Sequence, residues 1–372
     1  MKFQKLRKVV ASICVLALTL TMVAGCSGKT NDSASGSDGG KKKIKLRIGA
    51  GHVAENIAWT GTMDTFFAPE VSKRVAENTD YEIEWVKGYG GSIVKLGEAM
   101  EGVQNGLIDI TYVNFGFEPS KLMMHGMTFR MPFQSPDSNI VSKVALQLFD
   151  EYPDVFKAPF EEYNQKFLGL GVTDNYSIYS TYEINSIEDV SGKKFGAGGA
   201  NLSWIEGTGA VGVQSNLNEA YTSLQTGVYD GCINPTSACF NFKIQEVAPY
   251  VIKMNFGAQM AGALTMNLDK FNSLPKEVQD IIVEVGKEYS AQEAKNAQDK
   301  YDSDLKAMEE QGVKIVEITD EARAEWVAKL PNVVGNMVKE NNEKGLPATE
   351  IVNRYYELLK ENGFESPRDW EY

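Results

Sequence analysis

From Ile44 onward, apolar and polar residues recur in the two periods that mark strands and helices. IKLRIGA, at 44–50, alternates apolar with polar like a half-buried strand, whereas 59–75 carries apolar residues at helical spacing. Further strands are predicted at 81–86, 108–113, 167–172, 177–181, 194–197, 211–214, 228–233, 249–255 and 262–267, and further helices at 93–103, 138–150, 153–165, 201–206, 218–226, 275–311, 319–343 and 347–361. The alternation of the two kinds predicts an α/β protein with helices covering its sheets.

One phrase occurs twice in this pattern. QNGLIDITYVN at 104–114 returns as QTGVYDGCINP at 225–235. Each copy reads as a helix end, a glycine suited to the left-handed turn, and a strand whose carboxyl end reaches Asn114 or Asn234. Ligands of open α/β sheets bind beyond the carboxyl ends of the strands, so two such sheets facing each other would enclose a cleft.

The predicted helix at 275–311 is long enough to join the two halves. At 1.5 Å per residue it would measure about 50 Å. We therefore expect two α/β lobes that share this helix. Their expected limits are 44–166 plus about 256–296 for lobe I, 167–255 plus about 297–345 for lobe II, and 346–372 for a C-terminal helix.

The N-terminus reads as an export signal. Residues 1–25 combine four basic side chains with a short apolar run and small residues. The following V-A-G-C resembles a bacterial lipobox, which would make Cys26 a lipidated N-terminus, although an ordinary signal peptide with an incidental cysteine is the alternative. Residues 26–43 are rich in Ser and Gly, so we expect a flexible tether on the outer face of the cytoplasmic membrane.

Charge and composition narrow the classes of function. The chain has 372 residues with a formal charge of −13, which becomes −17 without the four positive charges of residues 1–25. Nucleic-acid binding needs a basic footprint and is not expected. Cys232 and Cys239 are predicted to be buried thiols. The chain has only two histidines and contains neither an H-E-x-x-H nor a G-x-S-x-G motif, which argues against the common metal and serine sites of hydrolases. We expect no metal, no cofactor and no enzymatic activity.

A G-x-G-x-x-G sequence at 207–212 is a weak sign of a dinucleotide site. That fingerprint requires a strand before the first glycine and a helix after the last. Here a short helix is predicted before it and a strand after it. We therefore expect no nucleotide there.

Two longer motifs resemble one family. INSIEDVSGKKFGA, ending at Ala197, is similar to I-x-S-x-x-D-L-x-G-x-K-I-R-V, and NEAYTSLQTGVYDGCINP at 218–235 is similar to E-V-Y-x-A-L-Q-T-G-V-V-D-G-x-x-x-P. Both patterns belong to the solute-binding proteins of TRAP transporters, of the DctP type. The resemblance implies a bilobal, periplasmic-binding-protein-like α/β fold that closes on a small organic anion. It also implies delivery to the membrane subunits of a permease driven by an ion gradient.

One departure from the family pattern falls on a residue that would bind the ligand. The pattern has an arginine that grips the ligand carboxylate where this chain has Gly196. Lysine cannot reproduce that two-pronged geometry. The solute is then either an anion held by Arg130, Lys193, Lys194 or backbone donors, or a neutral or aromatic compound held by stacking and amide hydrogen bonds. Simple C4-dicarboxylates are expected to bind weakly.

These arguments give a set of candidate ligand contacts: Trp59, Asn114, Phe115, Arg130, Tyr176, Tyr179, Gly196, Asn201, Trp204 and Asn234. Two other functions fit the same lobes. One is the solute-binding protein of an ATP-driven (ABC) importer, and the other is an exported, lipid-anchored hydrolase. The Q-T-G-V-x-D-G segment favours the TRAP family over the ABC importer.

Overall fold

Two mixed sheets carry the fold of the computed structural model, which describes residues 40–55 and 57–372. The predicted signal, the lipidation site Cys26 and most of the predicted tether lie outside these residues. The first sheet has the order β2 (Tyr81–Gly88), β1 (Lys42–Gly49), β3 (Ile110–Asn114), β10 (Met260–Asn267), β4 (Gln165–Val172). The second has the order β11 (Lys314–Glu317), β9 (Tyr250–Lys253), β5 (Tyr176–Ser180), β8 (Gly231–Pro235), β6 (Lys194–Ala197), β7 (Val211–Gln214).

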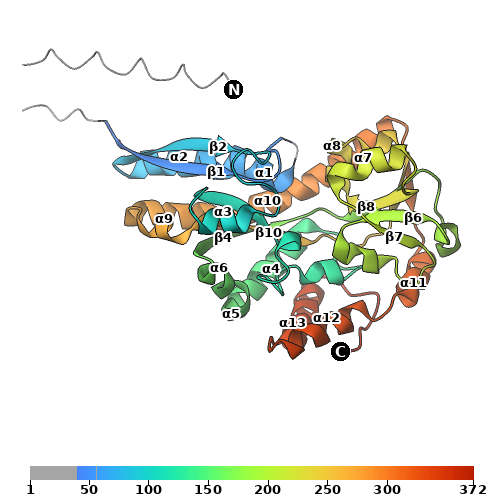
Figure 1. The fold of residues 1–372 in the computed structure, drawn as a ribbon. Helices are drawn as coiled ribbons and strands as arrows, with labels where there is room; N and C mark the ends of the chain where they lie inside the picture. The colour runs from blue at the N-terminus through green and yellow to red at the C-terminus, as the bar shows by residue number, and fades with distance from the viewer. Residues whose placement is uncertain (1–39, 56) are drawn as a thin grey trace, which may run out of the picture. The chain divides into compact units, whose positions relative to one another are not determined.

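Helices pack against both sheets (Figure 1). Those before the second sheet are α1 (Ala58–Thr62), α2 (Ala68–Asn78), α3 (Ala99–Gln104), α4 (Ser138–Glu151), α5 (Pro153–Phe156) and α6 (Ala158–Glu162). Later ones are α7 (Leu217–Gln225), α8 (Thr236–Asn241), α9 (Leu268–Asn272), α10 (Lys276–Glu310), α11 (Asp320–Lys329), α12 (Val333–Glu343) and α13 (Ala348–Glu361). Short turns are the π-helical η1 (Met63–Phe67) and the 3-10 segments η2 (Phe115–Phe117), η3 (Met127–Arg130), η4 (Ile187–Val190), η5 (Gly199–Trp204) and η6 (Ile244–Glu246).

The helix α10 links the two sheets, as predicted for the long helical pattern. It packs on β4 of the first sheet and on β11 and α8 of the second half (Figure 1). The helix crosses β4 so closely that α10 has a glycine at the contact. A Cβ at Gly286 would lie 2.7 Å from the Leu168 carbonyl oxygen of β4. The helix therefore serves as a common support for both sheets.

The repeated phrase forms the predicted helix ends, glycine turns and strands, although β8 begins at Gly231 and not at residue 228. Gly106 and Gly227 adopt left-handed φ angles of 66° and 72° directly after α3 and α7. β3 then ends at Asn114 and β8 ends at Pro235, one residue beyond Asn234. Both copies thus bring a carboxyl strand end to the edge of a sheet. The two buried thiols, Cys232 and Cys239, are also as predicted.

Three predicted helices are shorter than expected or divided in the structure. The helix expected at 93–103 exists only as α3, because Gly97 takes a φ of 86° that a right-handed helix cannot contain. The helix expected at 319–343 is split into α11 and α12 around Pro331, whose nitrogen has no hydrogen to donate. The helix expected at 153–165 is likewise divided into α5 and α6, with Pro159 in the first turn of α6.

The expected start of lobe II at residue 167 does not match the sheets. β4 pairs with β10 in the first sheet, where its apolar residues are buried against α10. The chain passes to the second sheet only after Val172, through 173–175, and returns through 254–259 between β9 and β10. Contacts join Lys41–Tyr372 into one compact unit, so the lobe limits remain a prediction.

The two crossing segments are tied together by hydrogen bonds. Thr173 donates its backbone N–H to the Gln259 carbonyl oxygen at 2.9 Å, and the Thr173 hydroxyl accepts from the Gln259 N–H at 3.0 Å. Asn175 accepts from the Gly257 N–H at 3.0 Å and donates to the Asn255 side chain at 2.9 Å. Side-chain amides thus satisfy the buried backbone where the chain changes sheet.

Candidate functional site

The carboxyl ends of three parallel strands meet at one edge of the second sheet. β6 pairs in parallel with both β7 and β8. Their ends and the residues just after them line a narrow crevice with no room for a water molecule: Gly196, Ala197, Gly198, Ser215, Asn216 and Asn234. The lining carries hydroxyl, amide and backbone groups and no charged side chain. This is the position where open α/β sheets bind ligands.

Two predicted contacts, Gly196 and Asn234, belong to this crevice. Asn234 is partly buried on β8, opposite Ser177 of β5. Sequence reasoning missed Ser215 and Asn216. They follow the predicted strand at 211–214, so applying the carboxyl-end rule to that strand as well would have found them.

Three more predicted contacts form an adjoining aromatic wall. The Tyr176 ring lies 5.2 Å from the Trp204 ring, edge to face. The Tyr176 hydroxyl is hydrogen-bonded to Asn201, whose backbone N–H donates to the Gly198 carbonyl oxygen at 2.9 Å. Burial raises the pKa of Tyr176 well above its ordinary value, so the phenol stays protonated. The wall is therefore neutral and connected to the crevice through Gly198.

Trp204 also joins η5 to the first half of the chain. Its indole N–H donates to the Phe129 carbonyl oxygen of η3 at 2.9 Å, and its own carbonyl oxygen accepts from the Trp326 indole at 2.8 Å. The side chain is fully buried. The segment η5 therefore contacts η3 as well as β6 and β7 of the second sheet. Small-molecule pockets measure roughly 300–1,000 Å³, so this narrow crevice would have to widen to hold a solute.

The remaining predicted contacts lie in other surroundings. Tyr179 is fully buried, and its hydroxyl donates to the Thr236 carbonyl oxygen at 3.3 Å. Phe115 packs on the buried His125 ring at 5.2 Å. Asn114 caps η2 by accepting from the Gly116 N–H at 3.0 Å. The structure records no contact between these side chains and the crevice lining.

Trp59 belongs to the core of the first sheet. Its ring stacks on Tyr112 at 6.0 Å, and its indole N–H donates to His52 Nδ1 at 3.4 Å. Burial lowers the pKa of His52 to about 4, so this imidazole is neutral at pH 7.

The three candidate cations do not converge on one point where they could hold a carboxylate together. Arg130 donates to Glu340 of α12 at 2.7 Å, so a solute carboxylate would compete with Glu340 for it. The Lys193 ammonium lies over the Tyr182 ring at 4.9 Å. Lys194 is exposed on β6. None of the three is among the residues that line the crevice.

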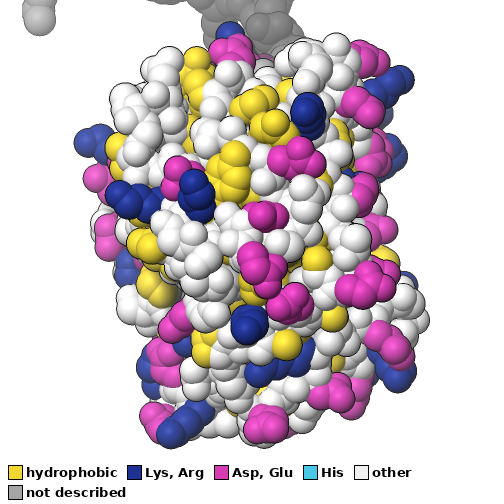
Figure 2. Space-filling view, turned by 90° about the vertical axis from the view of Figure 1, so that its right-hand side faces the viewer, with side chains coloured by type: hydrophobic (Ala, Val, Ile, Leu, Met, Phe, Trp, Pro, Cys, Tyr) yellow, Lys and Arg dark blue, Asp and Glu magenta, His cyan; other side chains and the backbone are white. Residues whose placement is uncertain are grey.

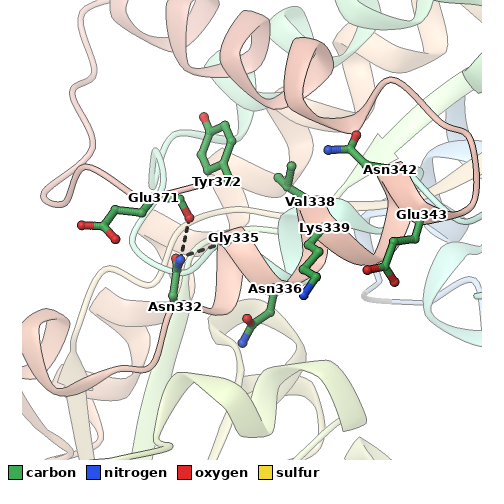
Figure 3. A pocket seen from close by; sticks show the side chains of 9 residues that line it. All are labelled: Asn332, Gly335, Asn336, Val338, Lys339, Asn342, Glu343, Glu371 and Tyr372. Atoms are coloured by element: carbon green, nitrogen blue, oxygen red, sulfur yellow. Dashed lines mark hydrogen bonds between the residues drawn. The ribbon is translucent and has the colours of Figure 1, made fainter.

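A larger hollow lies on α12 (Figure 3). It measures about 540 Å³ and is lined by α12 residues and the chain end, including Asn336, Lys339 and Tyr372. Asn332 donates to the Glu371 carbonyl oxygen at 2.5 Å and so fixes the chain end beside the helix. This hollow contains no strand end. We therefore take the crevice, and not the larger hollow, as the candidate solute site.

Charge and metal-ligand grouping indicate no second kind of site among the residues considered next. On the face shown in Figure 2, basic and acidic side chains are interspersed. Within residues 40–55 and 57–372, no three His, Cys, Asp or Glu side chains are grouped to hold a metal ion. No helix in the same residues has the length and apolarity needed to cross a membrane. The glycines at 207–212 precede and enter β7, which is the reverse of the dinucleotide arrangement.

Comparison with known proteins gives one family. The model of the bacterial extracellular solute-binding proteins, family 7 (DctP), matches residues 54–341. A solute-binding protein of Albidiferax ferrireducens is 31% identical over 143 residues, covering 37% of this chain and 42% of that relative. The ectoine-binding periplasmic protein TeaA of Halomonas elongata is 22% identical over 310 residues, covering 81% of this chain and 88% of TeaA.

A solved structure shares the fold. A TRAP periplasmic solute-binding protein from Sulfitobacter sp. NAS-14.1, with bound β-D-galacturonate, superimposes with a TM-score of 0.69 at 22% identity. The match covers 84% of this chain and 99% of that structure. The two-sheet arrangement is therefore a periplasmic-binding-protein-like, bilobal fold.

Proposed function

This chain belongs to the DctP family of bacterial extracellular solute-binding proteins, family 7, and we propose that its crevice captures a small organic solute for a TRAP-type importer. One observation carries the proposal. The carboxyl ends of β6, β7 and β8 converge on a crevice lined with hydrogen-bonding groups. The aromatic wall of Tyr176 and Trp204 would cover the solute from the side of η3.

The solute we propose is an organic anion or zwitterion of the size that related receptors bind. The similar proteins are named for ectoine or contain β-D-galacturonate. Asn234, Asn201 and the backbone at Gly198 would donate hydrogen bonds to it, and Trp204 would contribute apolar surface. Arg130 becomes available to a carboxylate only if its pair with Glu340 opens.

The receptor would work at the outer face of the cytoplasmic membrane. The lipobox-like V-A-G-C and the Ser/Gly-rich residues 26–43 support a lipid anchor at Cys26 with a flexible tether. Such a tether raises the local concentration of the receptor near the membrane subunits of its permease. We assign it solute delivery and no catalytic step, in keeping with a family defined by solute binding.

The test compares two asparagines that line the two different hollows. Solutes that stabilise the purified protein are first found by thermal shift, since a ligand at a hundred times its Kd adds about 2.7 kcal/mol to the folded state. We expect Asn234→Ala to weaken the solute found at least tenfold by calorimetry, about 1.4 kcal/mol. Asn336→Ala, in the hollow on α12, serves as the matched control and should leave affinity unchanged. The reverse pattern would move the site to α12.

A further inference from the structure

The absence of a side chain at Gly196 leaves no empty space beside its Cα. A Cβ at this position would lie 2.5 Å from Cε1 and 2.6 Å from Cζ of Tyr229. Distances below 3.0 Å are not tolerated without movement of one partner. By contrast, a Cβ at Gly198, two residues along, would meet nothing within 4 Å. The phenol ring of Tyr229 thus occupies the volume beside Gly196, whereas Gly198 faces open space.

Tyr229 is held firmly in that place. It is 2% exposed and packs with Ala220 and Leu224 of α7 in the core behind the sheet. Its hydroxyl lies 3.2 Å from the Ser215 hydroxyl oxygen, and Ser215 lines the crevice. Burial raises the pKa of Tyr229, so the phenol is neutral and can donate to Ser215. One side chain therefore both fills space behind β6 and supports a crevice hydroxyl.

The two positions also differ together from the family pattern. The pattern has Arg where this chain has Gly196, and Val where it has Tyr229. In this chain the Tyr229 ring contacts the position that is arginine in the pattern, so an uncharged phenol occupies the space in which that side chain would begin.

We propose that Tyr229 is a positioning residue for specificity, which excludes an arginine clamp and makes this wall select solutes that present hydroxyl or amide groups. The proposal rests on the proposed function and names the chemistry of the same site. Ser215, Asn216 and Asn234 would exchange neutral hydrogen bonds with such groups. A solute that offers only carboxylates has no charged partner on this wall.

The packing part of the proposal is tested by a double-mutant cycle. Gly196→Ala should lower the Tm by several degrees in the native chain and by much less in a Tyr229→Val background. Gly198→Ala is the matched control and should leave the Tm unchanged, since its Cβ has no neighbour within 4 Å. Equal losses in both backgrounds would overturn the contact between Gly196 and Tyr229.

The specificity part uses three probes of graded chemistry: succinate with carboxylates alone, gluconate with a carboxylate and hydroxyls, and mannitol with hydroxyls alone. The native protein should be stabilised by gluconate or mannitol and not by succinate. Tyr229→Phe, which keeps the ring and loses the hydroxyl, should weaken the responding probe at least threefold with a Tm within about 2 °C of the native value. Gly196→Arg/Tyr229→Val should gain succinate binding by at least tenfold.

The other outcomes separate the specificity proposal from the receptor function. A native protein that responds to succinate alone would overturn the neutral wall while leaving the receptor function intact. The neutral wall is also overturned if the folded Gly196→Arg/Tyr229→Val protein gains no affinity for succinate. A native protein that responds to no compound in a broad solute screen would instead overturn the proposed function itself, even if the packing cycle succeeds.

Discussion

At the residue scale, Trp204 has two separable roles. It fills the core between η3 and η5, and it forms the wall beside Asn201. Removing so large a buried ring costs about 3–5 kcal/mol of stability in typical cores. Losing the indole N–H alone costs about 1 kcal/mol.

We expect Trp204→Ala to weaken solute binding at least tenfold, about 1.4 kcal/mol. Because this variant also loses core packing, Trp204→Phe provides a milder version that keeps an aromatic ring. Trp85→Phe is its control, since Trp85 on β2 likewise donates one indole hydrogen bond, to Ser72 at 2.7 Å. Calorimetry should show weaker binding for both Trp204 variants and no change for Trp85→Phe. Unchanged affinity in Trp204→Ala would remove this residue from the site.

At the element scale, the crossing of α10 over β4 fixes how closely helix and sheet approach. A Cβ at Gly169 of β4 would lie 2.4 Å from the Gly286 carbonyl oxygen. A Cβ at Gly286 would in turn meet Leu168. The two glycines let the backbones touch, and neither position has room for a methyl group.

Gly286→Ala should therefore destabilise the protein although alanine is the better helix former by about 1 kcal/mol. We expect a net loss of about 1–3 kcal/mol from overpacking, measured by urea unfolding. Ser303→Ala, at an exposed position of the same helix, is the control and should be neutral or slightly stabilising. A stabilised Gly286→Ala protein would show that the helix can shift away from the sheet.

Glu293 of the same helix is buried at the end of β4. One carboxyl oxygen accepts from the Val172 N–H at 2.9 Å, and the other has no hydrogen-bond partner. Burial raises its pKa well above the ordinary value, so the group favours the protonated form. Glu293→Gln should be neutral or stabilising at pH 8, whereas Glu293→Leu should lose about 1–3 kcal/mol by leaving the Val172 N–H unpaired. Urea unfolding of both variants distinguishes them, and equal losses would contradict this account.

At the scale of the whole molecule, Asp174 lies where the chain passes from one sheet to the other. Its carboxylate accepts from the Thr236 N–H at 2.6 Å and from the Ser237 side chain, at the start of α8. Burial, with a smaller contribution from Asp304, raises its pKa from 3.8 to about 7 despite these hydrogen bonds. The crossing therefore carries a group that titrates differently in the folded and unfolded states.

The folded protein holds this proton more tightly than the unfolded chain does. Its contribution is most favourable below the unfolded pKa and is lost as the pH rises from about 4 to about 7. We expect stability to fall across that window by up to about 1.4 kcal/mol per pH unit from this group. Asp174→Asn should flatten the fall, and Asp299→Asn, an exposed carboxylate on α10, should not. Unfolding midpoints measured between pH 4 and pH 8 test this expectation, and an unchanged slope in Asp174→Asn would contradict it.

The sequence by itself determined the local structure and the family. The hydrophobic periodicity predicted β6 and β7 with their observed bounds, and α10 to within a residue or two. Such elements are predictable because the conformation of each depends mainly on residues that are neighbours in the chain. The sequence also placed Gly196 and Asn234 at strand ends. The helices expected at 93–103 and 319–343 are interrupted at Gly97 and Pro331. Both interruptions could have been predicted from these residue types.

Only the tertiary structure decided which strands share a sheet and which side chains meet. β4 lies where lobe II was expected to begin, yet it pairs with β10 of the first sheet and is buried against α10. The sequence leaves open whether Arg130 binds the ligand or forms an ion pair, and only the structure supplies its partner, Glu340 of α12. Gly196 reads as a gap until the turn before β8 brings Tyr229 into that space. Periodicity reports which face of an element is apolar, but not which partner from a distant part of the chain will cover it.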